Sequence, residues 1–235
     1  MKRPKIVPPW LVPKPLRSGE LLRSRSIILR HFLKNYGWLR SFREGRCVNQ
    51  DGLPIPWFTY PAIDFLSQLD LSDRTVFEYG SGASTLFWST RARHVISVES
   101  EPDWFERVVN SAPANVEMLL VSREIEEYAG AIRGRGQFDV IVVDGTGESR
   151  DLCCEMALKH IRPGGIVIFD DSDTWLRCAA LLRNSGLIQA DFTGFAPLIV
   201  TAKCTSVFFT REYDMAPIDG YQPHASVAQP AKPWP

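Results

Sequence analysis

The chain has 235 residues and a mass of 26.6 kDa, with 45% hydrophobic and 23% charged residues, which is a globular composition and excludes a fibrous repeat or wholesale disorder. Its 27 Lys and Arg balance its 27 Asp and Glu. Apolar runs such as 140–143 are much shorter than the roughly 18 residues that cross a bilayer, so we expect no transmembrane segment. Prolines interrupt the apolar stretch after the basic start, and the five cysteines lack metal-ligand spacing. These features favour a cytoplasmic protein with reduced thiols.

Positive charge is concentrated near the amino terminus. Residues 1–50 hold twelve Lys and Arg against two Glu, a net charge of +10, and residues 51–235 carry −10. Seven of these cations alternate with apolar residues at close to helical spacing over 23–46, with an interruption near Gly37. This amphipathic pattern is compatible with contact of residues 17–46 with an anionic membrane surface or a polyanion, which would make the protein peripheral at the membrane. The alternative is that the apolar stripe packs on the rest of the chain.

Short β-branched or aromatic runs alternate with helix-length segments from residue 75 onward. The expected strands are 75–79, 94–98, 116–121, 138–143 and 165–169. The expected helices are 84–90, 102–110, 124–132, 150–161 and 173–184. Two further runs, 187–193 and 205–210, have no helix between them and predict an antiparallel pair at the sheet edge. We therefore expect an α/β fold with a Rossmann-like seven-stranded sheet, mostly parallel with an antiparallel last strand, and helices on both faces.

These patterns divide the chain into three parts. Residues 1–74 form a basic amino-terminal helical extension, 75–212 form the sheet domain, and the proline-rich residues 213–235 are expected to be a flexible tail. The aromatic and proline residues of 52–61 suit a rigid lid over an acceptor pocket, with 194–197 as a second wall. The alternative is that these aromatic side chains attach the extension to the sheet.

A glycine-rich turn follows the first expected strand. The run Glu78-Tyr79-Gly80-Ser81-Gly82-Ala83-Ser84 places two glycines where a strand passes into a helix, so the backbone can approach a ligand closely. Glu99 ends the next strand, where a carboxylate can accept both hydroxyls of a ribose. Thr85 stands where a dinucleotide loop has its third glycine, and Glu78 would repel a diphosphate but suits a cationic ligand.

This loop resembles the first motif, E/D-x-G-x-G-x-G, of the class I S-adenosylmethionine-dependent methyltransferases, with Ser84 in place of the last glycine. The resemblance covers about residues 75–210, because 138–145 is similar to the family's fourth-strand motif and 161–171 to its L-x-P-G-G turn. It implies that S-adenosylmethionine is the cofactor. The positive sulfonium and ammonium groups of that molecule are opposite in charge to the Glu78 carboxylate. The expected cofactor-binding residues are Glu78, Tyr79, Gly80, Ser81, Gly82, Ser84, Glu99 and Asp144.

Carboxylates follow the fourth and fifth expected strands. Asp144, Asp170 and Asp171 are expected to converge with Tyr79 at the carboxyl ends of the strands, where ligands bind in such sheets. Their oxygens suit Mg²⁺, and the layout resembles that of the metal-dependent catechol and caffeoyl-coenzyme A O-methyltransferases, with Asp171 in place of an asparagine. That resemblance implies a metal at Asp144, Asp170 and Asp171 that holds the acceptor hydroxyl. The alternative is that Asp170 or Asp171 caps the helix expected near Asp173 and Asp144 anchors a turn.

The sequence places no histidine as a general base, so Asp144 and Asp170 are the expected catalytic residues. The run 144–147 differs from the Asn/Asp-Pro-Pro-Tyr/Phe motif of amino-directed nucleic-acid methyltransferases, which favours an oxygen acceptor. We therefore expect an O-methyltransferase that acts on a small-molecule or glycan hydroxyl, with assistance from Mg²⁺ as one version. The alternative is a non-catalytic cofactor-binding protein, or a membrane or polyanion binder that uses the basic amino-terminal helix.

Overall fold

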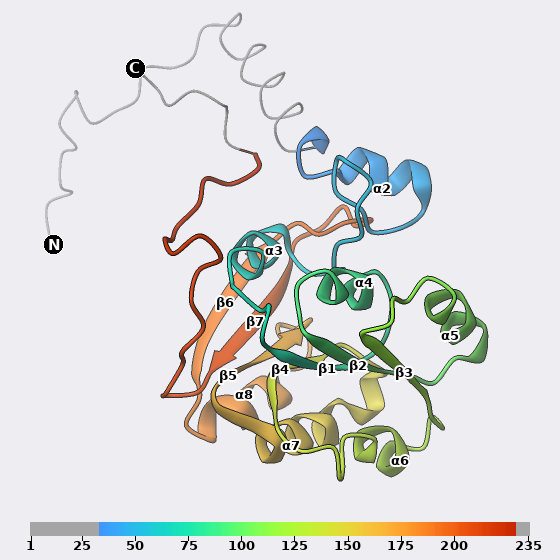
Figure 1. Ribbon diagram of the computed structural model, residues 1–235, viewed down its shortest axis with the longest axis vertical. Coiled ribbons are helices and arrows are strands. Elements are labelled where there is room, and N and C mark those ends of the chain that lie inside the picture. The colour runs from blue at the N-terminus through green and yellow to red at the C-terminus, as the bar shows by residue number, and fades with distance from the viewer. Residues whose placement is uncertain (1–32, 229–235) are drawn as a thin grey trace, which may run out of the picture.

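A seven-stranded sheet forms the centre of the chain in a computed structural model, which is described here for residues 33–228 (Figure 1). The strand order is β3-β2-β1-β4-β5-β7-β6. The strands are β1 Thr75–Tyr79, β2 His94–Glu99, β3 Val116–Leu120, β4 Phe138–Val143, β5 Ile161–Asp170, β6 Ile188–Gly194 and β7 Lys203–Phe209. Strands β1 to β5 pair in parallel, and β7 runs antiparallel to both β5 and β6. The expected Rossmann-like sheet with a reversed last strand is confirmed.

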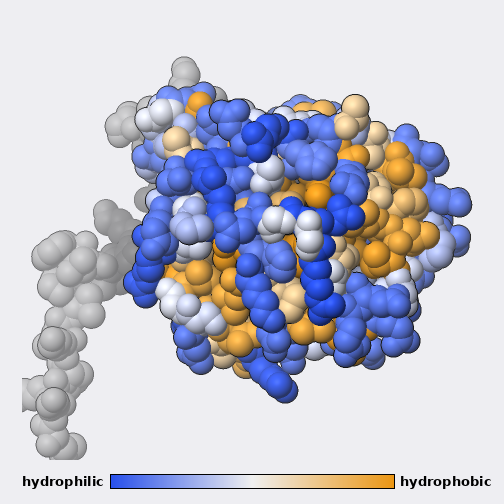
Figure 2. Space-filling view, turned by 60° about the horizontal axis from the view of Figure 1, so that its bottom comes forward, coloured by the Kyte–Doolittle hydropathy of each residue, from blue (hydrophilic) through white to orange (hydrophobic). Residues whose placement is uncertain are grey.

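Helices cover both faces of this sheet (Figure 1). In that view α6, α7 and α8 lie below the sheet, and α3, α4 and α5 lie above it. The helices are α2 Trp38–Glu44, α3 Tyr60–Leu66, α4 Ala83–Ser89, α5 Pro102–Val109, α6 Ile125–Gly130, α7 Arg150–His160 and α8 Leu176–Asn184. A single-turn 3-10 helix, η3 Gly147–Ser149, precedes α7. On the face that comes forward in Figure 2, apolar areas alternate with polar ones.

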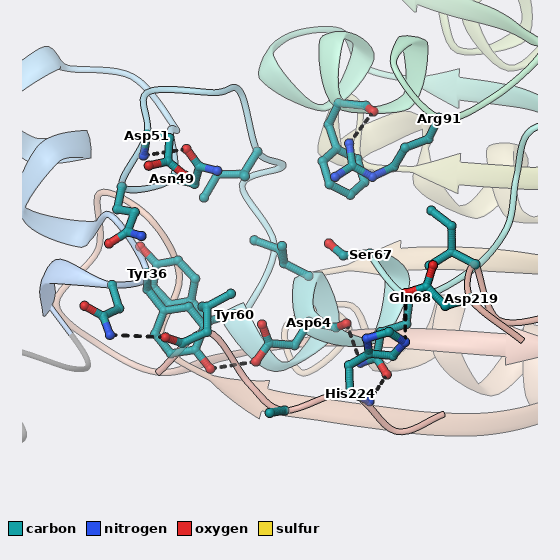
Figure 3. Close-up of a pocket in the computed structure, with 18 residues that line it drawn as sticks. Tyr36, Asn49, Asp51, Tyr60, Asp64, Ser67, Gln68, Arg91, Asp219 and His224 are labelled. Atoms are coloured by element: carbon teal, nitrogen blue, oxygen red, sulfur yellow. Dashed lines mark hydrogen bonds and ion pairs between the residues drawn. The ribbon is translucent and has the colours of Figure 1, made fainter. Parts of the chain in front are cut away.

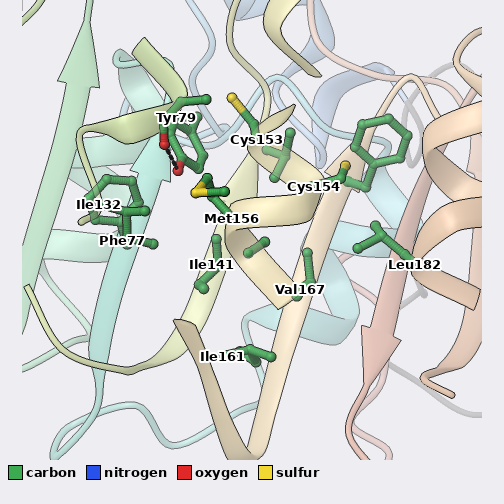
Figure 4. Packing of buried hydrophobic residues seen from close by; sticks show 14 of the residues in the cluster. Phe77, Tyr79, Ile132, Ile141, Cys153, Cys154, Met156, Ile161, Val167 and Leu182 are labelled. Carbon is green, nitrogen blue, oxygen red and sulfur yellow. Dashed lines mark hydrogen bonds between the residues drawn. The ribbon is translucent and has the colours of Figure 1, made fainter. Parts of the chain in front are cut away.

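The alternation of side chains along each strand builds a core on each face of the sheet. Phe77 and Ile141 pack against α6, α7 and α8 (Figure 4), whereas Val76 and Val140 pack against α3 and α4. All six residues of β4 are buried, as expected for a central strand covered on both faces. Because the strands are held from both sides, the ends of β1, β4 and β5 form a firm platform for a site.

The start of α8 differs from the sequence prediction. The helix begins at Leu176 rather than at Asp173, and its N-cap residue, Trp175, makes no side-chain capping bond. Residues 171–175 form a turn in which the Asp171 carbonyl accepts the N–H groups of Thr174 and Trp175 at 2.9 and 3.1 Å. The alternative that Asp170 or Asp171 caps this helix is therefore wrong, and both carboxylates are available for other contacts.

The segments before and after the sheet domain meet on α3. The expected break at Gly37 is confirmed, since Gly37 has φ 83° and α2 begins directly after it. Residues 17–32 of the basic segment lie outside the described residues. At the other end of the chain, Met215 is buried, and Ile218 N–H donates to the Gln68 carbonyl at 2.8 Å, so the segment expected to be flexible lies against α3 there. Within residues 33–228, no helix has the length and apolar composition needed to cross a bilayer.

Candidate active site

The glycine loop joins the end of β1 to the start of α4. Gly80 has φ 92°, and a Cβ placed on it would lie 3.0 Å from the Asp144 carbonyl oxygen. Gly82 has φ 159° and ψ −140°, a conformation that is essentially restricted to glycine. The two glycines therefore let the chain turn tightly beside the end of β4, as the motif predicts.

Glu78 lies beneath this loop and is completely buried. Its Oε2 accepts hydrogen bonds from the hydroxyls of Thr85 at 2.5 Å and Ser97 at 2.7 Å, and its Oε1 has no hydrogen-bond partner in the described part of the chain. Burial raises the pKa of Glu78, while the hydroxyls of Ser84, Thr85 and Ser97 lower it by a smaller amount. A cationic ligand above the loop would compensate the charge of this carboxylate.

Glu99 at the end of β2 is aimed at the same loop. Its Oε2 accepts the N–H of Ser81 at 3.3 Å and the Ser81 hydroxyl at 2.8 Å. Its Oε1 accepts the N–H groups of Ser100 at 2.7 Å and Glu101 at 2.9 Å. The backbone N–H groups fix the position of the Glu99 carboxylate. The Ser81 hydroxyl can rotate away, so a ribose hydroxyl can take its place as a donor to Oε2.

Trp104 lies beside the glycine loop and was not predicted from the sequence. Its indole N–H donates to the Ser81 carbonyl at 2.7 Å, and its ring is 3.6 Å from the position of a Cβ on Gly82. The residue is 44% exposed, so one part of the indole borders the loop and another part faces solvent. The signal that was available is an aromatic residue in the first turn of the helix that follows Glu99.

Three carboxylates meet at the ends of β4 and β5. Asp144, Asp170 and Asp171 each place an oxygen within 4.8 Å of the others. Tyr79 does not join them, because its hydroxyl donates to the Ala129 carbonyl at 2.7 Å within the core between the sheet and α6 (Figure 4). The expectation that the Tyr79 side chain converges with the carboxylates is therefore wrong.

Lys203, the first residue of β7, lies between two of these carboxylates. Its ammonium forms an ion pair with Asp170 Oδ2 and lies 3.1 Å from Asp171 Oδ1. The Thr205 hydroxyl donates to the other oxygen of Asp170 at 2.6 Å, so both oxygens of this buried carboxylate are bound. The sequence analysis missed Lys203, although Lys203 and Thr205 share one face of the strand by their spacing of two residues.

Arg150 provides a second cation from the start of α7. Its Nη2 lies 3.2 Å from Asp144 Oδ1, and no described residue donates to the Oδ2 of Asp144. Its Nη1 donates to the Asp170 carbonyl at 2.5 Å, and its Nε donates to the Gly145 carbonyl at 3.3 Å. The cluster thus contains three carboxylates and two cations.

The surroundings of these groups set their protonation. Burial raises the pKa of Asp144 well above its ordinary value, and the charge of Asp170 raises it further, against the opposing charges of Arg150 and Lys203. Burial raises the pKa of Asp170 to about 6, although Lys203 lowers it. Burial lowers the pKa of Lys203, but the neighbouring carboxylates outweigh that effect and hold it above its ordinary value. Lys203 is therefore charged at neutral pH, and Asp144 binds a proton more tightly than an exposed carboxylate does.

The lid segment is attached close to this cluster. Thr59 N–H donates to the Thr205 hydroxyl at 3.0 Å, and Tyr60 N–H donates to the Phe195 carbonyl at 2.8 Å. The charges of Lys203 and Asp144 also reach the thiol of Cys47, whose pKa burial raises to about 12. Phe58 and Tyr60 are buried, so part of the aromatic segment packs onto the sheet domain.

A cavity of about 390 Å³ lies apart from these groups (Figure 3). It is bounded by α3, α4 and the carboxyl-terminal segment, and its polar lining includes Asp64, Arg91 and His224. Glu99, Asp144 and Lys203 are not among the described residues that line it. This cavity is therefore separate from the platform at the strand ends.

Residues 77–172 match the family described as "Methyltransferase domain". The chain is similar in fold to the O-methyltransferase TomG from Streptomyces achromogenes, solved with S-adenosylmethionine: 15% identity, a TM-score of 0.54, and 83% of this chain matched to 99% of that one. Cofactor-bound Rv0187 from MTB shows 15% identity and a TM-score of 0.55, with 85% of this chain matched to 100% of that one. A putative O-methyltransferase from Klebsiella pneumoniae shows 12% identity and a TM-score of 0.53, with 84% and 91% of the two chains matched.

At such identities these structures show a shared fold alone, and no curated protein sequence matches the chain. The family match covers the glycine loop, Glu99 and the cluster up to Asp171. This match identifies residues 77–172 as a methyltransferase domain, and the sheet with its reversed last strand has the fold of the class I S-adenosylmethionine-dependent methyltransferases. The resemblance noted in the sequence is confirmed.

Proposed function

We propose that this methyltransferase transfers the methyl group of S-adenosylmethionine to a hydroxyl oxygen of a small-molecule or glycan acceptor. The observation that carries the proposal is the position of Asp144. This carboxylate is 26% exposed, has a raised pKa and stands at the end of β4, beside the glycine loop that follows β1. A carboxylate with these properties is suited to accept the proton of an alcohol.

The groups around the loop support binding of the cofactor in one orientation. Glu99 would accept the ribose hydroxyls, Gly80 and Gly82 would leave room for the methionine part, and Glu78 would face its positive charge from below. Trp104 would border the nucleoside beside Ser81. Bound there, S-adenosylmethionine supplies an electrophilic methyl carbon on a sulfonium sulfur.

The reaction then requires one proton transfer and one bond exchange. Asp144 accepts the proton of the acceptor hydroxyl through Oδ2, while Arg150 holds Oδ1. A lone pair of the acceptor oxygen forms the bond to the methyl carbon, and the electron pair of the broken carbon–sulfur bond stays on sulfur. The products are a methyl ether and S-adenosylhomocysteine, and Asp144 later releases its proton to water. Asp170, which is 1% exposed with both oxygens bound, positions Lys203 rather than touching the acceptor.

The Mg²⁺ site that the sequence predicts at Asp144, Asp170 and Asp171 does not fit the side chains present. The Lys203 ammonium already binds Asp170 and Asp171, and Arg150 binds Asp144. A divalent cation would have to displace an ammonium whose charge these same carboxylates stabilise. We therefore propose methyl transfer without a metal ion.

No observation favours membrane or polyanion contact through residues 17–46. Residues 17–32 lie outside the described residues, and in the remainder Arg40 and Arg46 both bind Glu44. We retain a cytoplasmic location as a proposal, which the five free and buried cysteines support.

Two measurements test the proposed function. S-adenosylhomocysteine is titrated calorimetrically into the full chain, and saturable binding at one site per chain is expected. The chain is then incubated with methyl-labelled S-adenosylmethionine and two libraries, one of alcohols and phenols and one of amines. Label in the hydroxyl library supports the proposal. Transfer confined to amines, or no binding of S-adenosylhomocysteine, would overturn it.

A further inference from the structure

A side chain of the protein itself, Lys203, lies between two of the three clustered carboxylates. Carboxylate oxygens of Asp144, Asp170 and Asp171 lie within 4.8 Å of one another, a spacing that suits a hard cation. Lys203 Nζ forms the ion pair with Asp170 and lies 3.1 Å from Asp171. Its side chain is 15% exposed, so the ammonium is largely shielded from water but not sealed off.

The backbone of Asp171 gives a second, independent observation. Asp171 has φ 54°, which places a non-glycine residue in the left-handed region at the end of β5. Such conformations cost free energy and persist where the surrounding structure enforces them, often at functional sites. Here the turn directs the Asp171 carboxylate to Lys203, while the neighbouring Asp170 reaches the same ammonium from inside the sheet.

Three elements hold Lys203 in this position. In the antiparallel pairing of β5 with β7, Asp170 lies opposite Thr205, which places Lys203 just past the end of β5. The Thr205 hydroxyl binds Asp170, and the Thr59 N–H of the lid segment binds Thr205. The ammonium therefore sits at a fixed point where β5, β7 and the lid segment meet.

We propose that the Lys203 ammonium takes the place of a divalent cation in this methyltransferase and binds the oxygen of the acceptor during transfer. This inference rests on the proposed function. An ammonium has three N–H donors, and the contacts of Lys203 in the described part of the chain are a hydrogen bond to Asp170 and an ion pair with Asp171, which leaves one donor beyond these two contacts. That donor is available to the acceptor oxygen beside Asp144.

The chemistry of this arrangement matches a hydroxyl acceptor. As Asp144 removes the proton, negative charge develops on the acceptor oxygen, and a hydrogen bond from an ammonium strengthens as that charge grows. A metal ion would provide the same stabilisation, but the ammonium provides it from a fixed side chain with two carboxylates as its supports. The acceptor class is thus an alcohol or phenol whose oxygen approaches between Asp144 and Lys203.

Metal binding provides a test that needs no acceptor. Mn²⁺ alone is titrated into the full wild-type chain and into Lys203→Met, which removes the charge and keeps an unbranched side chain. We expect wild type to bind Mn²⁺ only weakly, without saturation at one ion per chain, and Lys203→Met to bind one Mn²⁺ per chain with an affinity at least about tenfold higher, because the three carboxylates lose their internal cation. The double variant Lys203→Met/Asp171→Asn should lose this Mn²⁺ again. The matched control Lys159→Met, at an exposed position on α7, should behave as wild type.

The outcomes separate this inference from the proposed function. Calorimetric binding of S-adenosylhomocysteine serves as the fold control for every variant, and Lys203→Ala replaces Lys203→Met if the latter fails it. Stoichiometric Mn²⁺ on wild type, or none on a folded Lys203 variant, would overturn the role of Lys203 and leave the methyltransferase assignment intact. Once an acceptor is found, excess chelator should leave the wild-type rate within about twofold. A rate that collapses with the chelator would also overturn the inference.

Discussion

The guanidinium of Arg150 holds the carboxylate of Asp144 at the open end of the sheet, with 3.2 Å between Nη2 and Oδ1. The same side chain donates to the Asp170 carbonyl, so one residue of α7 ties the end of β4 to the end of β5. Its guanidinium carbon lies 5.7 Å from the ring centroids of both Phe169 and Trp175. Arg150 is 6% exposed, so water does not replace these contacts when one of them is lost.

Replacing Arg150 by Met should destabilise the fold. The change removes the cation bound to Asp144 and one hydrogen-bond donor from each of two carbonyl oxygens, and we expect the free energy of unfolding to fall by about 2–4 kcal/mol. Urea denaturation followed by circular dichroism measures it. Arg177→Met is the matched control, because Arg177 is 89% exposed and its one ion pair in the described part of the chain, with Asp151 at 3.6 Å, lies at the surface. This change should alter the free energy of unfolding by less than about 0.5 kcal/mol. Equal effects of the two changes would show that Arg150 does not hold the strand ends.

Glu99→Gln should weaken binding of S-adenosylhomocysteine. The variant loses a charged acceptor beside Ser81, and hydrogen bonds to charged groups contribute about 1.5–3 kcal/mol, so we expect about a ten- to hundredfold rise in the dissociation constant. Isothermal titration calorimetry at constant salt measures it. Glu101→Gln is the control, because Glu101 is half exposed and bound to Arg123, and its affinity should equal that of wild type. An unchanged affinity in Glu99→Gln would remove Glu99 from the cofactor site.

The sequence predicts the sheet well because local signals and long-range packing agree there. The run 138–143 is apolar except for Asp139 and becomes the central strand β4, and the pair β6 and β7 follows from the absence of a helix between them. The prediction is less accurate for β5, which starts at Ile161, because Pro163 and Gly164 look like a turn but lie within the strand. A shift in register between β4 and β5 accommodates them, and only the partner strand determines that shift.

The site is less predictable, because its groups come from strands far apart in sequence. The approach of Asp144 to Asp170 follows from parallel strand order, so the motifs predict it. Lys203 depends on the register between β5 and β7, and no periodicity within β7 reports which residue faces Asp170. Tyr79 is an avoidable error: it lies two residues after Phe77 in β1, so both share the face that packs on α6.

All five cysteines should resist modification in the folded protein. Each is at most 7% exposed, and burial raises the pKa of Cys47 and of Cys153 to about 12, so almost no thiolate forms at about pH 8. Ellman's reagent should therefore report no fast-reacting thiol in the native chain and five in guanidinium chloride. A single fast thiol in the native chain would show that the segment around that cysteine opens on the time scale of the reaction.

Glu78→Gln should change how stability depends on pH. Burial raises the pKa of Glu78 above 4.5, so the folded chain holds this proton more tightly than the unfolded chain does. Between the two pKa values the folded state binds more protons, and the wild-type free energy of unfolding falls as pH rises, by at most about 1.4 kcal/mol per pH unit. Glu78→Gln has no titrating group at this position, so its free energy of unfolding does not fall in this way. Its stability relative to wild type should therefore improve as pH rises above about 4.5. Urea denaturation across that range measures the difference. Glu117→Gln, at an exposed position paired with Arg135, should run parallel to wild type, and a parallel curve for Glu78→Gln would show that the buried carboxylate keeps its ordinary pKa.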